Sequence, residues 1–153
     1  MSDIKYIKTT KDDMELLMKV RLEMLREVNH LPDEYVYDEV LVKESRKYFE
    51  EGEQSTVLAF DGQEVVGCAS LSYIWIMPSF SHPTGKRAHL MNVYTRKDHR
   101  RMGISKKMVE TLINEAKEYG VTEISLDATK MGRPLYEVLG FVASSSGMVM
   151  EIK

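Results

Sequence analysis

The chain has 153 residues, of which 43% are hydrophobic and 29% are charged, and this composition predicts a single domain with a sizeable core over residues 1–153. The formal net charge of −3 argues against a general nucleic-acid binder, and no apolar run is long enough to cross a membrane. We expect a cytoplasmic protein for two reasons. The chain has one cysteine, Cys68, and its N-terminal residues lack the apolar core of a signal peptide.

The first third of the chain predicts one strand and two helices. The strand covers Ile4 to Thr9. Either Thr10 or Asp12 can cap the first helix, which we expect to end near Asn29, and a second helix follows over about 38–50. The first helix is predicted from residues that recur on one helical face: Met14, Leu17, Met18, Arg21, Leu22, Leu25 and Val28.

A β-hairpin is predicted next. Two apolar runs, 55–60 and 65–76, are separated by Asp61-Gly62, a strong signal for a two-residue turn. Such a turn favours positive φ at both of its central residues, so we expect positive φ at Asp61 and at Gly62.

The middle of the chain predicts a strand, a tight turn and a helix in direct succession. The strand covers 89–95 and the helix 106–119. The turn between them leaves backbone N–H groups unpaired at the positive end of the helix, and Gly103 lacks a side chain that would keep a ligand away from them. Four basic residues surround the turn: Arg100, Arg101, Lys106 and Lys107. These features predict a cradle for a pyrophosphate.

The last part of the chain predicts shorter elements. A strand over 123–127 follows the preceding helix and implies a parallel pair with the strand before it. A short helix over 132–139 begins with Pro134 in its first turn. Two closing strands are expected, over 141–142 and 148–152.

Two motifs together resemble the GNAT N-acetyltransferases, and the resemblance covers nearly the whole chain. They are the Arg-x-x-Gly-x-small turn at 100–105 and the Leu-Tyr-x-x-x-Gly-Phe sequence at 135–141. The resemblance implies an α/β fold whose mixed, mostly antiparallel sheet is flanked by helices on both faces. It also implies direct transfer of an acetyl group from acetyl-CoA to a primary amine of a small molecule or peptide, without a metal. Homodimers are common in the family.

The resemblance assigns roles to individual residues. The backbone of 100–105 would hold the pyrophosphate, and Val93 and Thr95 would pair with the pantetheine arm. Tyr136 would protonate the departing thiolate, although at helical spacing it could equally be an aromatic core residue. A backbone N–H near Val93 or Tyr94 could stabilise the oxyanion. The full set of implied cofactor-binding residues is Val93, Tyr94, Thr95, Arg100, Arg101, Met102, Gly103, Ile104, Ser105, Thr129 and Arg133.

The chain departs from the family pattern at several positions. Ser105 and Gly132 stand where other small residues are usual, and Thr129 replaces a frequent asparagine. The strand over 89–95 lacks the glutamate that often serves as general base. Five side chains remain candidates for that role, as does a chain of waters: Glu23, Glu27, Glu34, His82 and His89.

Two alternatives to acetyl transfer remain open at this stage. The same scaffold could use another acyl-CoA donor, or it could be a non-catalytic module that binds acyl-CoA. The two N-terminal helices and the loop over 78–87 would shape the acceptor pocket, but the loop is equally compatible with a solvated connection between strands.

Overall fold

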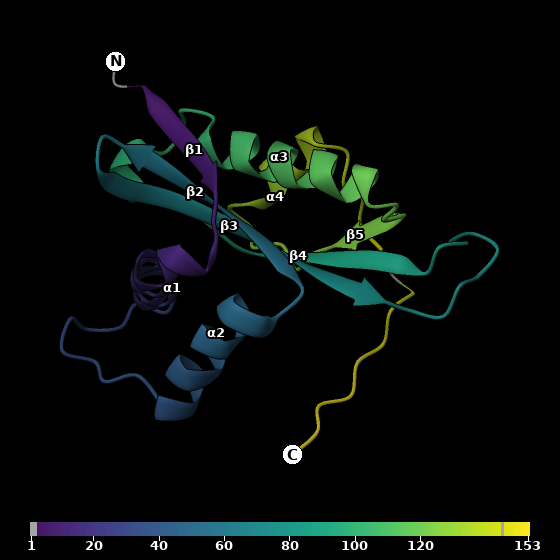
Figure 1. The fold of residues 1–153 in the computed structure, drawn as a ribbon, viewed down its shortest axis with the longest axis horizontal. Coiled ribbons are helices and arrows are strands. Elements are labelled where there is room, and N and C mark those ends of the chain that lie inside the picture. The colour runs from purple at the N-terminus through teal and green to yellow at the C-terminus, as the bar shows by residue number, and fades with distance from the viewer. Residues whose placement is uncertain (1–2, 145) are drawn as a thin grey trace.

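The computed structural model describes residues 3–144 and 146–153, and its centre is a five-stranded sheet in the order β1-β2-β3-β4-β5 (Figure 1). The strands are β1 (Ile4–Lys8), β2 (Gln54–Asp61), β3 (Glu64–Trp75), β4 (Lys86–Thr95) and β5 (Glu123–Ser125). The helices are α1 (Met14–Val28), α2 (Glu39–Glu51), α3 (Ile104–Glu118) and α4 (Arg133–Val138), with short 3-10 turns η1 (Lys11–Asp13) and η2 (Lys97–His99). β4 and β5 are parallel and the other neighbours are antiparallel, which confirms the predicted mixed sheet.

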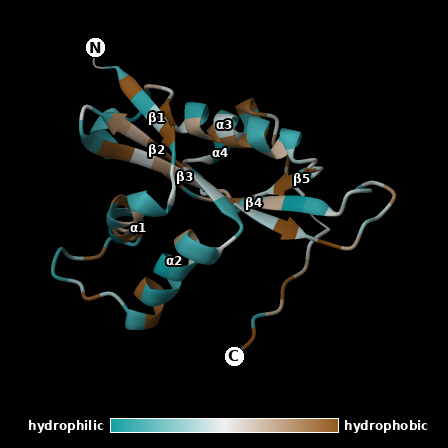
Figure 2. Ribbon diagram, viewed as in Figure 1, coloured by the Kyte–Doolittle hydropathy of each residue, from teal (hydrophilic) through white to brown (hydrophobic). Residues whose placement is uncertain are grey.

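Helices cover both faces of the sheet because the central strands are apolar on both sides. In β2, Val57 and Ala59 pack in the cluster formed with α3, whereas Leu58 and Phe60 pack in the cluster formed with α1. Successive side chains of a strand point to opposite faces, so one apolar run serves two cores. Figure 2 shows hydrophilic and hydrophobic residues alternating around α1, α2 and α3, as expected of helices with one face in solvent. None of the helices in the described residues is both long and apolar enough to cross a bilayer.

The hairpin between β2 and β3 is confirmed, but its predicted turn geometry is wrong. Asp61 pairs with Glu64, so the two central residues are Gly62 and Gln63. Gly62 has a positive φ of 63°, whereas neither Gln63 nor Asp61 has a positive φ. Glycine at the first central position is the pattern of a type II′ turn. Asp61 therefore belongs to the strand, from which its carboxylate reaches His99 at 2.8 Å.

The two predicted C-terminal strands are also wrong. After α4, the described residues 141–144 and 146–153 form no strand, and the chain runs away from the sheet (Figure 1). Met148, Val149 and Ile152 are each more than 85% exposed. An apolar pattern produces a strand only where a sheet edge is available to pair with it, and the edge strand β5 is only three residues long.

Candidate functional site

The second half of β4 forms an open edge of the sheet. β5 pairs only with Arg87, Ala88 and His89, so the rest of β4 has β3 on one side and no described strand on the other. Val93, Tyr94 and Thr95, the residues expected to meet the pantetheine arm, all lie in this open part. Unpaired backbone N–H and C=O groups at a strand edge can hydrogen-bond an extended ligand.

A β-bulge interrupts β4 next to this open edge. The pairing of β3 with β4 shifts register so that Asn92 and Val93 lie opposite Ala69, and Asn92 has a positive φ of 58°. The Asn92 side chain is held from two sides: Arg21 Nη1 donates to its Oδ1 at 3.2 Å, and its Nδ2 donates to Ser70 Oγ at 3.2 Å. Non-glycine residues with positive φ and bulges are both concentrated at functional sites. Neither Asn92 nor Arg21 is among the site residues predicted from the sequence.

The predicted cradle lies directly beyond the open edge, in the turn that begins α3. Arg101 and Gly103 both have positive φ, 64° and 76°, and buried Ile104 begins the helix. Within the described chain, the backbone N–H groups from Arg101 to Lys106 donate no hydrogen bond. A Cβ added to Gly103 would have no protein atom within 4 Å. The turn thus presents free donors and open space at the positive end of a 15-residue helix.

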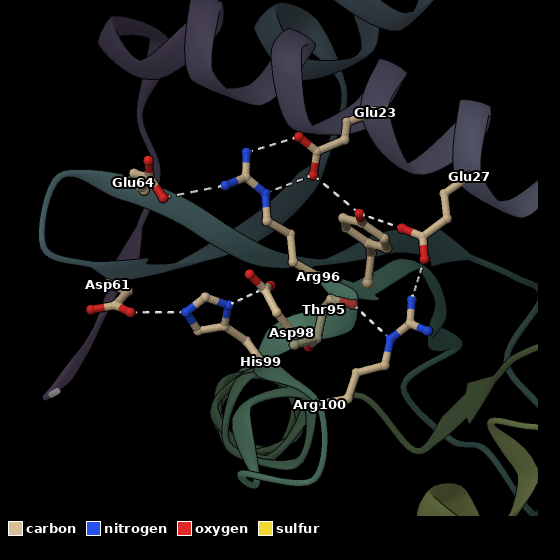
Figure 3. Close-up of polar contacts among 10 residues, drawn as sticks. Glu23, Glu27, Asp61, Glu64, Thr95, Arg96, Asp98, His99 and Arg100 are labelled. Carbon is tan, nitrogen blue, oxygen red and sulfur yellow. Dashed lines mark hydrogen bonds and ion pairs between the residues drawn. The ribbon is translucent and has the colours of Figure 1, made fainter. Parts of the chain in front are cut away.

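Arg100 and Arg96 point away from this cradle and toward α1 (Figure 3). Arg100 Nη2 donates to Glu27 at 2.7 Å and its Nε to the Thr95 carbonyl at 3.0 Å. Arg96 makes two hydrogen bonds of 2.9 Å to the Glu23 carboxylate. The Arg100 guanidinium is therefore engaged within the protein, and Arg101, Lys106 and Lys107 remain as the exposed cations around the turn.

Glu23 and Glu27 each form an ion pair with an arginine of the β4–α3 connection. Besides their arginines, both accept a hydrogen bond from the Tyr94 hydroxyl, at 3.1 and 2.5 Å. Burial raises the pKa of Glu23, but hydrogen bonds from Arg96 and Tyr94 outweigh it and hold that pKa below its ordinary value. Burial and the two carboxylates raise the pKa of Tyr94. The network ties α1 to the β4–α3 connection.

The other predicted bases lie elsewhere. Glu34 is exposed in the α1–α2 connection. His82 contacts Thr122 at 2.8 Å and Glu123 at 3.4 Å, and His89 contacts Ser125 at 2.7 Å in the part of β4 that β5 covers. The two histidines thus connect β4 and the loop before it to the β5 side of the fold. A role as general base stays a prediction for Glu34, His82 and His89.

Three further predicted residues lie on or before α4. Tyr136 is half-buried, packs edge-on against Phe141 at 5.9 Å between ring centroids, and borders the same core cluster as Val93. Its hydroxyl has no hydrogen-bond partner in the described residues, and burial raises its pKa. Thr129 accepts a hydrogen bond from Gly132 N at 3.0 Å, which helps to start α4, and Arg133 pairs with Glu137 at 3.0 Å. Cofactor contacts by Thr129 and Arg133 remain predictions.

His99 lies between two carboxylates, and we expect it to make the stability of the protein depend on pH. Its ring nitrogens contact Asp61 and Asp98, each at 2.8 Å, and these hydrogen bonds raise the His99 pKa above 6.5. A histidine whose pKa is higher in the folded state than in the unfolded state stabilises the protein when it is protonated. This stabilisation is complete at pH values below the pKa of the unfolded state, and it is lost as the pH rises through the pKa of the folded state. We expect the free energy of unfolding of the wild type to fall above pH 6.5 more than that of His99→Gln. Urea denaturation from pH 5.5 to 9 measures this difference, and parallel profiles would contradict it.

A pocket of about 250 Å³ lies on the other side of β4 from α3, between the sheet and the α1–α2 pair. It is lined by Arg21, Leu41, Glu44, Ser45, Tyr48, Phe49, Ser70, Met91 and Asn92. The predicted helix pair thus contributes to it. The loop before β4 does not: Thr84 and Lys86 instead hydrogen-bond the carbonyls of Gly120 and Tyr119, at the far end of β4 from the cradle.

The sequence pattern of the acetyltransferase (GNAT) family matches residues 22–141, from the middle of α1 to the end of the Leu-Tyr-x-x-x-Gly-Phe motif. The chain therefore belongs to the GNAT acetyltransferase family. Membership makes it an N-acetyltransferase, as the two motifs predicted. Comparison with curated proteins finds no match to this chain.

Solved structures with this fold cover almost the whole chain. A predicted acetyltransferase from Clostridium acetobutylicum, solved with acetyl-CoA, is 26% identical with a TM-score of 0.84, and the match covers 97% of this chain and 96% of that one. A GCN5-related N-acetyltransferase from Ralstonia eutropha is 24% identical with a TM-score of 0.75, covering 98% and 99%. An aminoglycoside acetyltransferase from an uncultured soil sample is 14% identical with a TM-score of 0.75, covering 98% and 95%.

Proposed function

We propose that this protein transfers the acetyl group of acetyl-CoA directly to a primary amine of a small molecule or peptide. The observation that carries the proposal is the cradle at Arg101–Lys106, with its unpaired backbone donors and the open space at Gly103. The presence of acetyl-CoA in the similar Clostridium structure supports the choice of donor. A single buried thiol, Cys68, supports the expected cytoplasmic location.

In this proposal each part of the site has one task. The backbone N–H groups of the cradle hold the pyrophosphate, and the open edge at Val93 and Thr95 pairs with the pantetheine arm. The neutral amine attacks the thioester carbonyl, and a backbone N–H near Val93 or Tyr94 stabilises the oxyanion. The C–S bond then breaks, the thiolate takes a proton from Tyr136, and the amine nitrogen loses its proton to a base or water.

Ligand-linked stability tests the choice of cofactor. A ligand that binds only the native state stabilises it by about 2.7 kcal/mol at a hundredfold excess over Kd. For a chain of this size we expect the melting temperature to rise by about 5–10 °C with CoA or acetyl-CoA. NAD and ATP serve as controls and should give little shift, because they lack the pantetheine arm. Equal shifts with ATP would indicate a general nucleotide site.

A panel of primary amines, with release of free CoA thiol as the signal, tests the proposed acceptor class. Turnover with at least one primary amine supports the proposal, whereas CoA binding without turnover of any primary amine would contradict it. Repeating the assay with propionyl-CoA and succinyl-CoA distinguishes acetyl transfer from transfer of another acyl group.

A further inference from the structure

Arg21 is a cation on the otherwise apolar inner face of α1. Its neighbours on that helix, Leu17, Met18 and Met24, are buried in the core beneath the sheet. Arg21 instead lines the pocket between α1, α2 and β4, together with apolar side chains such as Phe49 and Met91, and its Nη1 donates to another lining residue, Asn92.

The charge of Arg21 has no counter-ion in the described structure. Its one hydrogen bond is to Asn92 Oδ1, and no described carboxylate lies within ion-pair distance. Arg96 and Arg100, by contrast, are each paired with a glutamate. Burial lowers the pKa of Arg21, as expected for a cation removed from water without a carboxylate beside it.

The remaining donors of Arg21 determine what the pocket can hold. A guanidinium has five N–H donors in a planar fork that matches the two oxygens of a carboxylate. Among the described lining residues the one carboxylate is that of Glu44, which is exposed and makes no ion pair with Arg21. Most of the surface exposed in the pocket is nevertheless apolar, so it fits the body of an organic ligand rather than a hydrated inorganic anion.

The pocket opens beside the proposed point of acetyl transfer. Asn92 lines the pocket and is also the bulge residue that immediately precedes Val93 and Tyr94. A ligand anchored at Arg21 would therefore extend from the α1–α2 side of the sheet toward the open edge of β4.

We propose that the acceptor is an amine that also carries a carboxylate, and that Arg21 binds this carboxylate. The inference rests on the proposed acetyl transfer, because that function makes the pocket an acceptor site. The apolar side chains between Arg21 and β4 hold the body of the acceptor, and the amine faces the thioester. The acceptor class is thus amino acids or peptides with a free carboxyl group near the reacting amine.

A purely structural role for Arg21 predicts a different result. If Arg21 only oriented Asn92, its loss would slow transfer to every amine by the same factor. A carboxylate clamp instead changes the ratio between acceptors that do and do not carry the negative charge. The decisive measurement is therefore a ratio of kcat/KM values, not a single activity.

The experiment uses matched pairs of acceptors, each consisting of an amino acid and its primary amide. One series of pairs varies the apolar side chain, and the other places one to five methylene groups between the amine and the carboxyl group. We expect the wild type to favour the acid in the best pair by at least about tenfold in kcat/KM. Arg21→Gln should reduce this ratio to near one, and Arg21→Lys should retain part of it. Lys19→Gln, which removes an exposed cation from the same helix, should leave the ratio unchanged.

A binding measurement makes the test independent of turnover. Titration calorimetry should show that 3-phenylpropionate binds the wild type at least about tenfold more tightly than 3-phenylpropanamide, and that Arg21→Gln abolishes the difference. Calorimetry with CoA on the same variants should give unchanged affinity, which shows that they are folded. An acid-to-amide ratio near one in the wild type, with CoA bound and amines acetylated, would overturn this inference and leave acetyl transfer intact. Failure to bind CoA would instead overturn the proposed function itself.

Discussion

Tyr136→Phe is expected to reduce kcat by about 10²- to 10⁴-fold, the usual contribution of a general acid, with little change in the KM for acetyl-CoA. The substitution removes only the hydroxyl, so the ring keeps its edge-on contact with Phe141 and its place beside the core. The hydroxyl has no protein partner in the described residues and its pKa is raised by burial. It is therefore protonated at neutral pH and available to a ligand, as a proton donor must be.

The competing explanation is that Tyr136 only packs against the cofactor. In that case phenylalanine would be nearly as good, and kcat would stay within about twofold. Tyr119→Phe is the matched control, because it also removes one tyrosine hydroxyl. Tyr119 is 55% exposed and lies at the C-terminal end of α3, whereas the cradle lies at the N-terminal end of this helix. Steady-state kinetics on an accepted amine, with circular dichroism to verify the fold, distinguishes the two explanations. A near-normal kcat would leave water as the acid.

Gly103→Val is expected to weaken CoA binding by at least about tenfold. The substitution places a branched side chain in the open space at the N-terminus of α3, where the pyrophosphate would approach the free N–H groups. Gly103 has a φ of 76°, so any side chain is also strained there and the loss of stability must be separated from the loss of binding.

Gly62→Val is a suitable control for that strain. Gly62 also has a positive φ, 63°, and a Cβ there would also meet no atom within 4 Å, but it lies in the β2–β3 turn. Both variants should lose comparable stability in urea denaturation, whereas only Gly103→Val should lose CoA affinity in calorimetry. Unchanged CoA affinity in a folded Gly103→Val protein would show that the pyrophosphate lies elsewhere.

The two variants should fail in different ways. Tyr136→Phe should bind CoA normally and turn over slowly, and Gly103→Val should bind CoA weakly. This separation is expected because, in the proposed function, the cradle binds the cofactor through backbone groups at the start of α3, while Tyr136 on α4 protonates the leaving sulfur.

Local sequence determined most of the secondary structure and the place of the cradle. The period of apolar residues located α1 and α3 to within a few residues, because an amphipathic helix must bury one face. The cradle was predictable for a similar reason: a strand, a short turn with Gly103 and a helix are contiguous, so their geometry depends little on the rest of the chain.

Contacts between distant parts of the chain decided the rest. Glu23 and Arg96 are 73 residues apart, so no local pattern shows that this glutamate ties α1 to the β4–α3 connection. The bulge at Asn92 arises from the register of β4 against β3, and the absence of strands in the described residues after α4 depends on the short edge that β5 offers. One signal was present in the sequence, namely a charged Arg21 on an apolar helical face. Only the packing of α1, α2 and β4 shows that this charge lines a pocket without a counter-ion, because burial and pairing are properties of the assembled fold.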